Sequence, residues 1–205
     1  MPLAIFSIAF ALIEAAVVVY LRKLYYPDGF SLPLSPLQRE MIFTETMREA
    51  ATLVVIASVS ILSDKVWAKR WCYFIFSFAL WDIFYYVWLK FFIDWPESLF
   101  APDILFLIPV IWWGPVLAPL IVASTLSAGS SLYLYRLESG SRPTMGAAYI
   151  VGLLFAITII LYTFMVDATI LESGKMPPPF RWLLFASGEL IAIGTLVKML
   201  FMERK

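Results

Sequence analysis

Six apolar stretches, each long enough to cross a lipid bilayer, follow one another along this chain of 205 residues. A transmembrane helix needs about 20 predominantly apolar residues to cross the hydrocarbon core. Hydrophobic residues make up 62% of the chain and charged residues only 15%, whereas a soluble domain carries about 25% charged residues. We therefore expect an all-α, six-span transmembrane helical bundle, with residues 1–205 forming a single integral membrane domain. The expected spans are residues 3–21, 42–62, 68–92, 103–124, 145–166 and 182–202.

The fourth expected span differs from the others because it contains Pro109, Pro115 and Pro119. Each proline removes a helical hydrogen-bond donor and crowds the carbonyl group four residues earlier. The sequence therefore predicts a kinked or broken fourth span. Discontinuous spans often line the binding sites of transporters.

Composition excludes several classes of function. The chain has no histidine and a single cysteine, Cys72. His-ligated haem or metal sites, histidine-dependent catalysis and an internal disulfide are therefore excluded, and no other cofactor can be inferred. The net charge is zero and no basic stripe occurs, so no nucleic acid partner is expected. No nucleophile motif is recognisable, which leaves enzymatic activity uncertain and not favoured.

Charged residues interrupt the second expected span. Glu45, Arg48, Glu49 and Thr52 are spaced so that they share one helical face. A charged side chain near the bilayer centre costs about 2.5–3.5 kcal/mol on insertion scales. Each of these charges therefore needs a partner, water or a proton.

Three other spans contribute one acid each: Glu14, Asp82 and Glu189. With a rise of about 1.5 Å per residue and alternating span direction, these acids and Glu49 fall in the same half of the bilayer, about 3–5 Å from its centre. Tyr85 and Tyr86 lie one helical turn from Asp82 and can donate hydrogen bonds to it. We expect these groups to form one polar cluster.

The expected cluster contains five acids and one base, Arg48. Arginine stays protonated and can pair with one carboxylate, so the other acids must be protonated, solvated or matched by a cation. Five interpretations remain open. They are an interhelical clamp, a proton or cation path, a cavity for a lipid, quinone or other small amphiphile, a carboxylate-only metal site, and intramembrane catalysis.

Loop charges and the N-terminal segment indicate the orientation. Lysine and arginine are slightly more numerous in the loops on the side of the termini, which favours a multi-pass protein with a cytoplasmic N-terminus. The first apolar stretch lacks a basic segment before it and is interrupted by Glu14. We therefore expect a retained span there, not a cleaved signal peptide.

Three segments resemble a family of uncharacterised bacterial polytopic membrane proteins. They are Trp81–Tyr86 (WDIFYY), Trp95–Leu99 (WPESL) and Asp103–Pro109 (DILFLIP), and the similarity extends to Arg48–Thr52. The resemblance covers about the first 120 residues. It implies a bacterial membrane protein and carries no established activity or functional residue.

These observations lead to two functional hypotheses. The first is a proton- or cation-linked transporter, or a small-amphiphile-binding protein, with its polar site between spans 1, 2, 3 and 6. The second is a structural or assembly subunit that binds a membrane protein partner within the lipid bilayer. The candidate binding or ion-exchange residues are Glu14, Glu45, Arg48, Glu49, Asp82, Tyr85, Tyr86 and Glu189.

Overall fold

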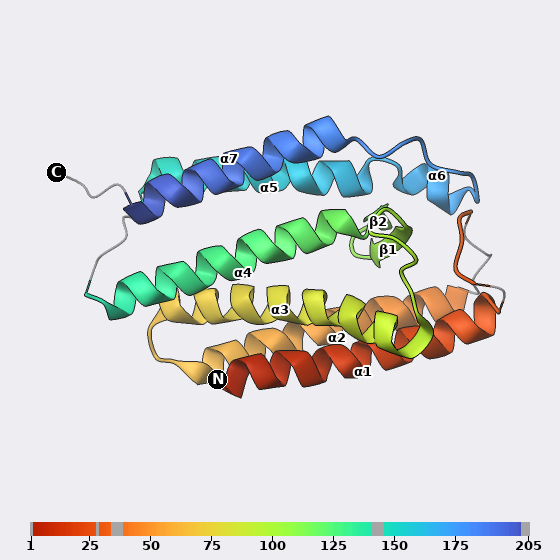
Figure 1. Cartoon of the computed structure of the whole chain (residues 1–205), viewed down its shortest axis with the longest axis horizontal. Coiled ribbons are helices and arrows are strands. Elements are labelled where there is room, and N and C mark those ends of the chain that lie inside the picture. Colours follow the sequence, from red (N-terminus) through yellow and green to blue (C-terminus); the bar gives the residue numbers. More distant parts are fainter. Residues whose placement is uncertain (1, 28, 34–38, 141–145, 202–205) are drawn as a thin grey trace.

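Six long helices dominate the structure, a computed structural model that describes residues 2–27, 29–33, 39–140 and 146–201 (Figure 1). All six are long and apolar enough to cross a membrane, so the prediction of an all-α, six-span bundle is confirmed. The long helices are α1 (Pro2–Tyr25), α2 (Arg39–Ser63), α3 (Trp67–Ile93), α4 (Leu117–Glu138), α5 (Ala147–Met165) and α7 (Trp182–Phe201). A short helix, α6 (Ala168–Glu172), follows α5, and two strands, β1 (Pro102–Phe106) and β2 (Trp112–Pro115), precede α4.

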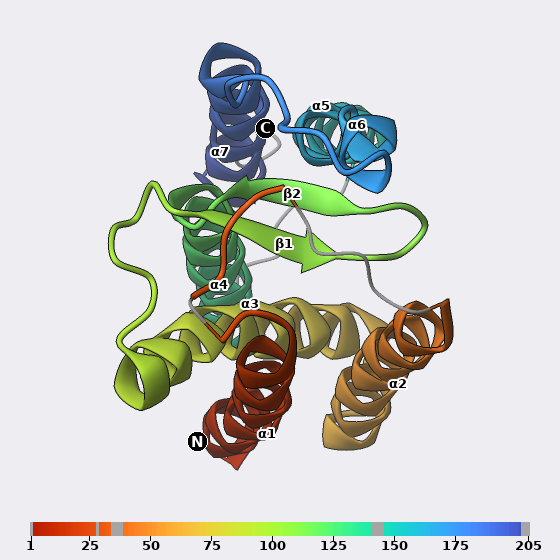
Figure 2. The same cartoon turned by 90° about the vertical axis from the view of Figure 1, so that its right-hand side faces the viewer.

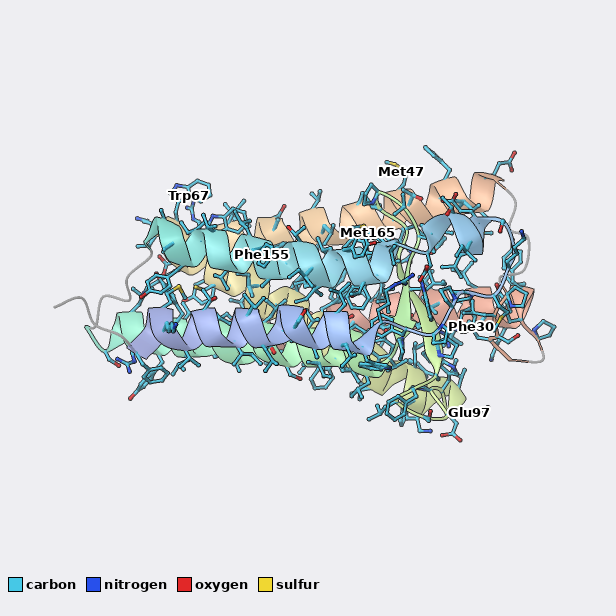
Figure 3. The ribbon with its side chains drawn as sticks, turned by 90° about the horizontal axis from the view of Figure 1, so that it is seen from above. Phe30, Met47, Trp67, Glu97, Phe155 and Met165 are labelled. Atoms are coloured by element: carbon cyan, nitrogen blue, oxygen red, sulfur yellow. The ribbon has the colours of Figure 1, made fainter. Side chains whose placement is uncertain are left out.

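Successive long helices run in opposite directions, so α1 begins and α7 ends at the same end of the bundle (Figure 1). The opposite end holds the β1–β2 hairpin, α6 and the segment that follows α1. Large apolar side chains cover much of the outer surface. Met47, Trp67 and Phe155 are examples, with exposed fractions of 55%, 63% and 58% (Figure 3). This outer surface is the one expected of a protein surrounded by lipid.

The predicted fourth span is wrong in its position. Residues 102–115 form an antiparallel hairpin in which Asp103 pairs with Gly114 and Ile104 with Trp113. Pro109 lies in the turn and Pro115 ends β2, so neither interrupts a helix. The fourth long helix begins only at Leu117, and Pro119 lies in its first turn, where a missing donor is tolerated. The predicted kinked or broken span is therefore not confirmed.

The bundle has two parts, which Figure 2 shows on either side of the hairpin. In the first part, α3 packs against α1 and α2. In the second part, α5 packs against α7. Helix α4 packs against α3 and, less extensively, against α7, so it joins the two parts. The hairpin is anchored on the second part by β2, which contacts α5 and α4.

Aromatic residues fill the space between the hairpin and the second part. Trp113 of β2, Phe164 of α5, Phe180 and Phe185 are all buried in one cluster. Gly114 allows the strand to lie directly on the ring of Phe164, because a Cβ atom there would meet that ring at 3.2 Å. This close packing fixes the hairpin at the end of the bundle, from which β1 reaches the first part.

Candidate functional site

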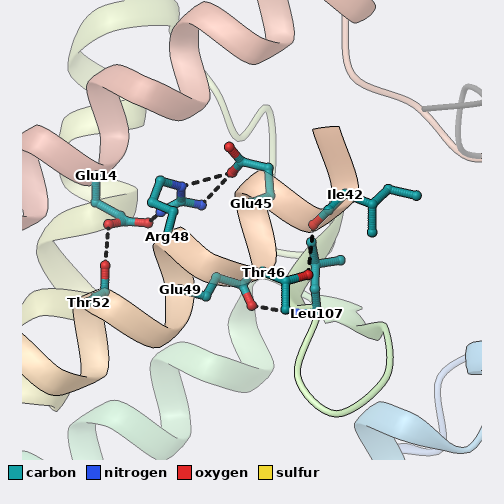
Figure 4. A network of polar contacts seen from close by, with 8 residues as sticks. All are labelled: Glu14, Ile42, Glu45, Thr46, Arg48, Glu49, Thr52 and Leu107. Carbon is teal, nitrogen blue, oxygen red and sulfur yellow. Dashed lines mark hydrogen bonds and ion pairs between the residues drawn. The ribbon is translucent and has the colours of Figure 1, made fainter. Parts of the chain in front are cut away.

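The polar face predicted on the second span is present on α2 (Figure 4). Arg48 donates from Nε to Oε2 of Glu45 at 2.8 Å, and its Nη2 lies 2.8 Å from the same oxygen. Its Nη1 forms an ion pair with Glu14 of α1. Thr52 donates its hydroxyl hydrogen to the other oxygen of Glu14 at 3.0 Å. The single positive charge of Arg48 is therefore shared between two carboxylates.

Glu49 points to a different partner from the same face of α2. Its Oε2 accepts a hydrogen bond of 2.8 Å from the backbone N–H of Leu107, in the turn of the hairpin (Figure 4). Among the described residues, no lysine or arginine forms an ion pair with Glu49. Glu49 thus links α2 to the hairpin without a counter-ion of its own.

These groups surround a small cavity of about 60 Å³ between α1, α2, α3 and β1. Asp82, Tyr85 and Tyr86 of α3 line the same cavity. The side chain of Asp82 forms no hydrogen bond or ion pair with any described residue. The full set of lining residues is Glu14, Val18, Arg48, Glu49, Thr52, Trp81, Asp82, Tyr85, Tyr86, Ile104, Leu105 and Phe106. Six of the eight predicted site residues therefore line the cavity, and a seventh, Glu45, is joined to it through Arg48.

Glu189 lies elsewhere. It accepts a hydrogen bond of 2.9 Å from the hydroxyl of Thr125, so it joins α7 to α4 and does not line the cavity. The expectation that the sixth span contributes to the polar site is therefore wrong. Counting residues along a span gives the depth of a side chain but does not show which neighbour the side chain faces. The side of the cavity that was assigned to the sixth span is formed by β1 of the hairpin.

The sequence reasoning missed an ion pair at the end of the cavity. Arg22 of α1 donates from Nη2 to Oδ1 of Asp103 in β1 at 2.8 Å, and the exposed fractions of the two side chains are 9% and 2%. The guanidinium group of Arg22 also lies 3.6 Å from the ring centre of Trp95 and 4.7 Å from that of Phe30. Burial raises the pKa of Asp103 to about 6, although Arg22 opposes this shift. No local pattern signals a pair whose members are 81 residues apart.

A second ion pair, also missed, lies in the other part of the bundle and joins the buried Asp167 to the partly exposed Arg181. Arg181 holds Asp167 with two hydrogen bonds, of 2.5 Å from Nη1 and 3.1 Å from Nη2. Trp113 of β2 adds a contact of 3.4 Å from its Nε1 to Asp167. A bidentate pair of this kind satisfies the carboxylate fully. It joins the end of α5 to the start of α7 and to the hairpin.

A larger cleft of about 940 Å³ opens at the hairpin end of the bundle. It is lined by α1, by the segment after α1 and by the connection from α3 to β1. Arg22, Lys23, Phe30, Trp95 and Glu97 are among its residues, and Figure 3 shows Phe30 and Glu97 at this end. The cleft therefore combines aromatic rings with charges of both signs.

Comparisons with protein-family models, with curated proteins and with solved structures find no match. The fold and the cavity define a class: a multi-pass membrane protein with a buried cluster of carboxylates and arginine. The function of the eight predicted residues stays a prediction, which has to be argued from geometry and charge.

Proposed function

We propose that this protein is a proton-linked membrane transporter in which Glu49 and Asp82 bind and release the proton. The observation that carries the proposal is the imbalance of charge around the small cavity. Arg48 is the one base among the described residues that line it, and Glu14 and Glu45 already share that base. Two further carboxyl groups face the same space without a counter-ion.

Uncompensated carboxylates are costly in a low-dielectric interior, where like charges repel strongly. Protonation removes the charge without requiring any further group. When the proton leaves, the charge reappears and repels its neighbours, so proton binding at Glu49 and Asp82 is coupled. A coupled pair of acids beside a fixed arginine is a suitable device for linking proton binding to a change of helix arrangement.

The size of the cavity favours a proton over a larger ligand. A space of about 60 Å³ holds a few water molecules, whereas ligand pockets usually measure about 300–1,000 Å³. Among the residues that the structure describes, no three Asp, Glu, Cys or His side chains are placed to hold a metal ion. Water and protons are therefore the occupants that we assign to the cavity.

The cleft at the hairpin end is large enough for a solute. Its volume of about 940 Å³ lies within the usual range for ligand pockets. Aromatic rings from Phe30, Trp95 and Phe100 beside the charges of Lys23 and Glu97 suit a small amphiphile. We propose a small amphiphile as the transported solute. We place the protein in a bacterial cell membrane with a cytoplasmic N-terminus, so that the cleft faces outward.

Proton uptake into liposomes tests the proposal. Vesicles loaded with potassium and a pH-sensitive dye develop an interior-negative potential when valinomycin is added, and this potential draws protons inward. We expect liposomes with the wild-type protein to acidify faster than protein-free liposomes. Glu49→Gln and Asp82→Asn should abolish the difference. Glu189→Gln, which removes a buried acid outside the cavity, should leave it unchanged.

A different result would favour the structural alternative. If Glu49→Gln and Asp82→Asn behave as the wild-type protein and no proton movement exceeds the protein-free rate, the transporter proposal is wrong. The Arg48 network would then be an interhelical clamp, which the ion pair between Arg48 of α2 and Glu14 of α1 also supports. Co-purification of a stoichiometric membrane partner would then identify the protein as an assembly subunit.

A further inference from the structure

The cavity and the cleft come together at β1. Pro102 lines the cleft, Ile104 lines the cavity, and Asp103 lies between them in the sequence of the strand. Helix α1 shows the same arrangement, since Val18 lines the cavity and Arg22 lines the cleft. Arg22 lines the cleft itself and its partner Asp103 lies between a cleft residue and a cavity residue, so we infer that the Arg22–Asp103 ion pair lies at the boundary between the two spaces.

Asp103 has an oxygen atom free to receive a proton at this boundary. Its side chain is 2% exposed. Its Oδ1 accepts the hydrogen bond from Arg22. Its Oδ2 is buried and forms no hydrogen bond within normal geometric limits to a described residue, although the Tyr86 hydroxyl lies near enough to interact with this carboxyl group. Because a buried carboxylate oxygen that lacks a well-placed donor is unfavourable, we assign the added proton to this oxygen.

The groups that face Asp103 come from two helices. Arg22 approaches from α1, and Asp82, Tyr85 and Tyr86 approach from α3. The Tyr86 hydroxyl lies close enough to favour the charged form of Asp103. Tyr85 is within electrostatic reach of both Asp103 and Asp82, and of both Arg22 and Arg48. The surroundings of Asp103 thus connect the boundary with the acids of the cavity.

We propose that Asp103 is the group that passes protons between the end cleft and the carboxyl groups of Asp82 and Glu49. This inference rests on the proposed function. Water in the cleft gives a proton to Oδ2 of Asp103, where a new O–H bond forms, and the remaining hydroxide leaves into bulk water. The same O–H bond then breaks as the proton moves through cavity water to Asp82. Asp103 returns to the carboxylate form, still held by Arg22, which acts as a positioning residue.

Hydrogen–deuterium exchange followed by infrared spectroscopy tests this role without requiring a transported solute. Neutral carboxyl groups absorb separately from ionised ones, and their bands shift when deuterium replaces hydrogen. Spectra of Glu49→Gln and Asp82→Asn assign the bands of those two acids in the wild-type protein. The rate at which the assigned bands shift in heavy water then measures proton access to the cavity.

Three variants separate proton transfer from structural support. Asp103→Asn cannot accept a proton, and we expect it to slow exchange at Glu49 and Asp82 on the order of 100-fold, the usual effect of a positioned proton-transfer group. Arg22→Gln breaks the same ion pair but keeps the carboxyl group, so exchange should slow much less than in Asp103→Asn. Asp103→Glu restores a carboxyl group and should also restore exchange.

Two results would overturn the inference while leaving the proposed function intact. One is exchange at the wild-type rate in Asp103→Asn. The other is an equal slowing in Asp103→Asn and Arg22→Gln, which would show that only the ion pair matters. If the wild-type spectrum contains no neutral carboxyl band that Glu49→Gln or Asp82→Asn removes, then both the proposed function and this inference are wrong.

Discussion

The two parts of the bundle bury their acids in different ways. In the second part, Asp167 is closed off by two hydrogen bonds from Arg181 and a contact from Trp113, against a cluster of aromatic rings. In the first part, Arg48 is divided between Glu14 and Glu45, while Glu49 and Asp82 face a cavity without a counter-ion.

Under the proposed function, this difference lets one fold combine a scaffold with a site that responds to protons. A carboxylate with matched donors stays charged and holds helices in place. Acids in excess of their bases respond to protons, because their charge is uncompensated. The hairpin touches both parts, since Trp113 reaches Asp167 and the turn at Leu107 binds Glu49. The scaffold thus positions one wall of the cavity.

The largest effect should follow the loss of Arg48. Arg48→Met leaves Glu14 and Glu45 buried without their base, and removing one partner of a buried ion pair costs about 3–5 kcal/mol of stability. Adding Glu14→Gln and Glu45→Gln to this variant should recover most of the loss. Unfolding in detergent mixtures, followed by circular dichroism, measures both. If Arg48→Met unfolded at the wild-type midpoint, Arg48 would not be the base that balances Glu14 and Glu45.

Close packing in the second part can be tested at two glycines of α7. A Cβ atom at Gly188 would meet Cγ1 of Ile160 at 2.8 Å and the backbone oxygen of Ala156 at 3.2 Å, whereas Gly194 has open space. Overpacking typically costs about 1–3 kcal/mol, and we expect Gly188→Ala to fall in this range. Gly194→Ala should not destabilise the protein, because alanine is favoured over glycine in a helix interior. Equal midpoints for the two variants would show that the α5–α7 contact is loose.

Neutralising one acid in each part sharpens the comparison directly. Asp167→Asn weakens both hydrogen bonds from Arg181 and should cost about 1–3 kcal/mol. Glu49→Gln keeps an oxygen to accept the Leu107 hydrogen bond and is neutral like the protonated acid, so its stability should stay within about 0.5 kcal/mol of the wild type. Thermal unfolding of the two purified variants provides the measurement. If Glu49→Gln lost more stability than Asp167→Asn, then Glu49 and not Asp167 would be the acid that holds the fold together.

A further prediction concerns pH and the boundary between cleft and cavity. The pKa of Asp103 rises from the ordinary 3.8 to about 6, chiefly through burial. The folded state therefore binds this proton more tightly than the unfolded state does. Its contribution to stability is complete below pH 3.8 and is lost as the pH rises through about 6.

Asp103→Asn isolates this contribution from the other acids. Its unfolding midpoint should fall less between pH 4 and pH 7 than that of the wild type, because the amide does not titrate over this range. Parallel pH series of the two proteins make the comparison. Curves of the same slope would show that Asp103 does not titrate in this window.

Much of the helical fold is readable from the sequence. Apolar length alone placed α1, α2, α3, α5 and α7 within a few residues, because membrane thickness sets the length of a span. The same criterion failed at residues 103–124, since an apolar run with Pro109 and Pro115 suits a buried hairpin as well as a helix. The Arg48 network followed from spacing along one helix. The Arg22–Asp103 and Arg181–Asp167 pairs depend on tertiary contacts that no local spacing encodes.

The protonation state of Glu49 and Asp82 at neutral pH tests the account most directly. Infrared spectra of the wild-type protein should contain absorption from neutral carboxyl groups. Glu49→Gln and Asp82→Asn should each remove part of that absorption, whereas Asp167→Asn, whose carboxylate is held by Arg181, should remove none. Spectra in which Glu49→Gln and Asp82→Asn match the wild type would contradict the claim that protons balance the acids of this cavity.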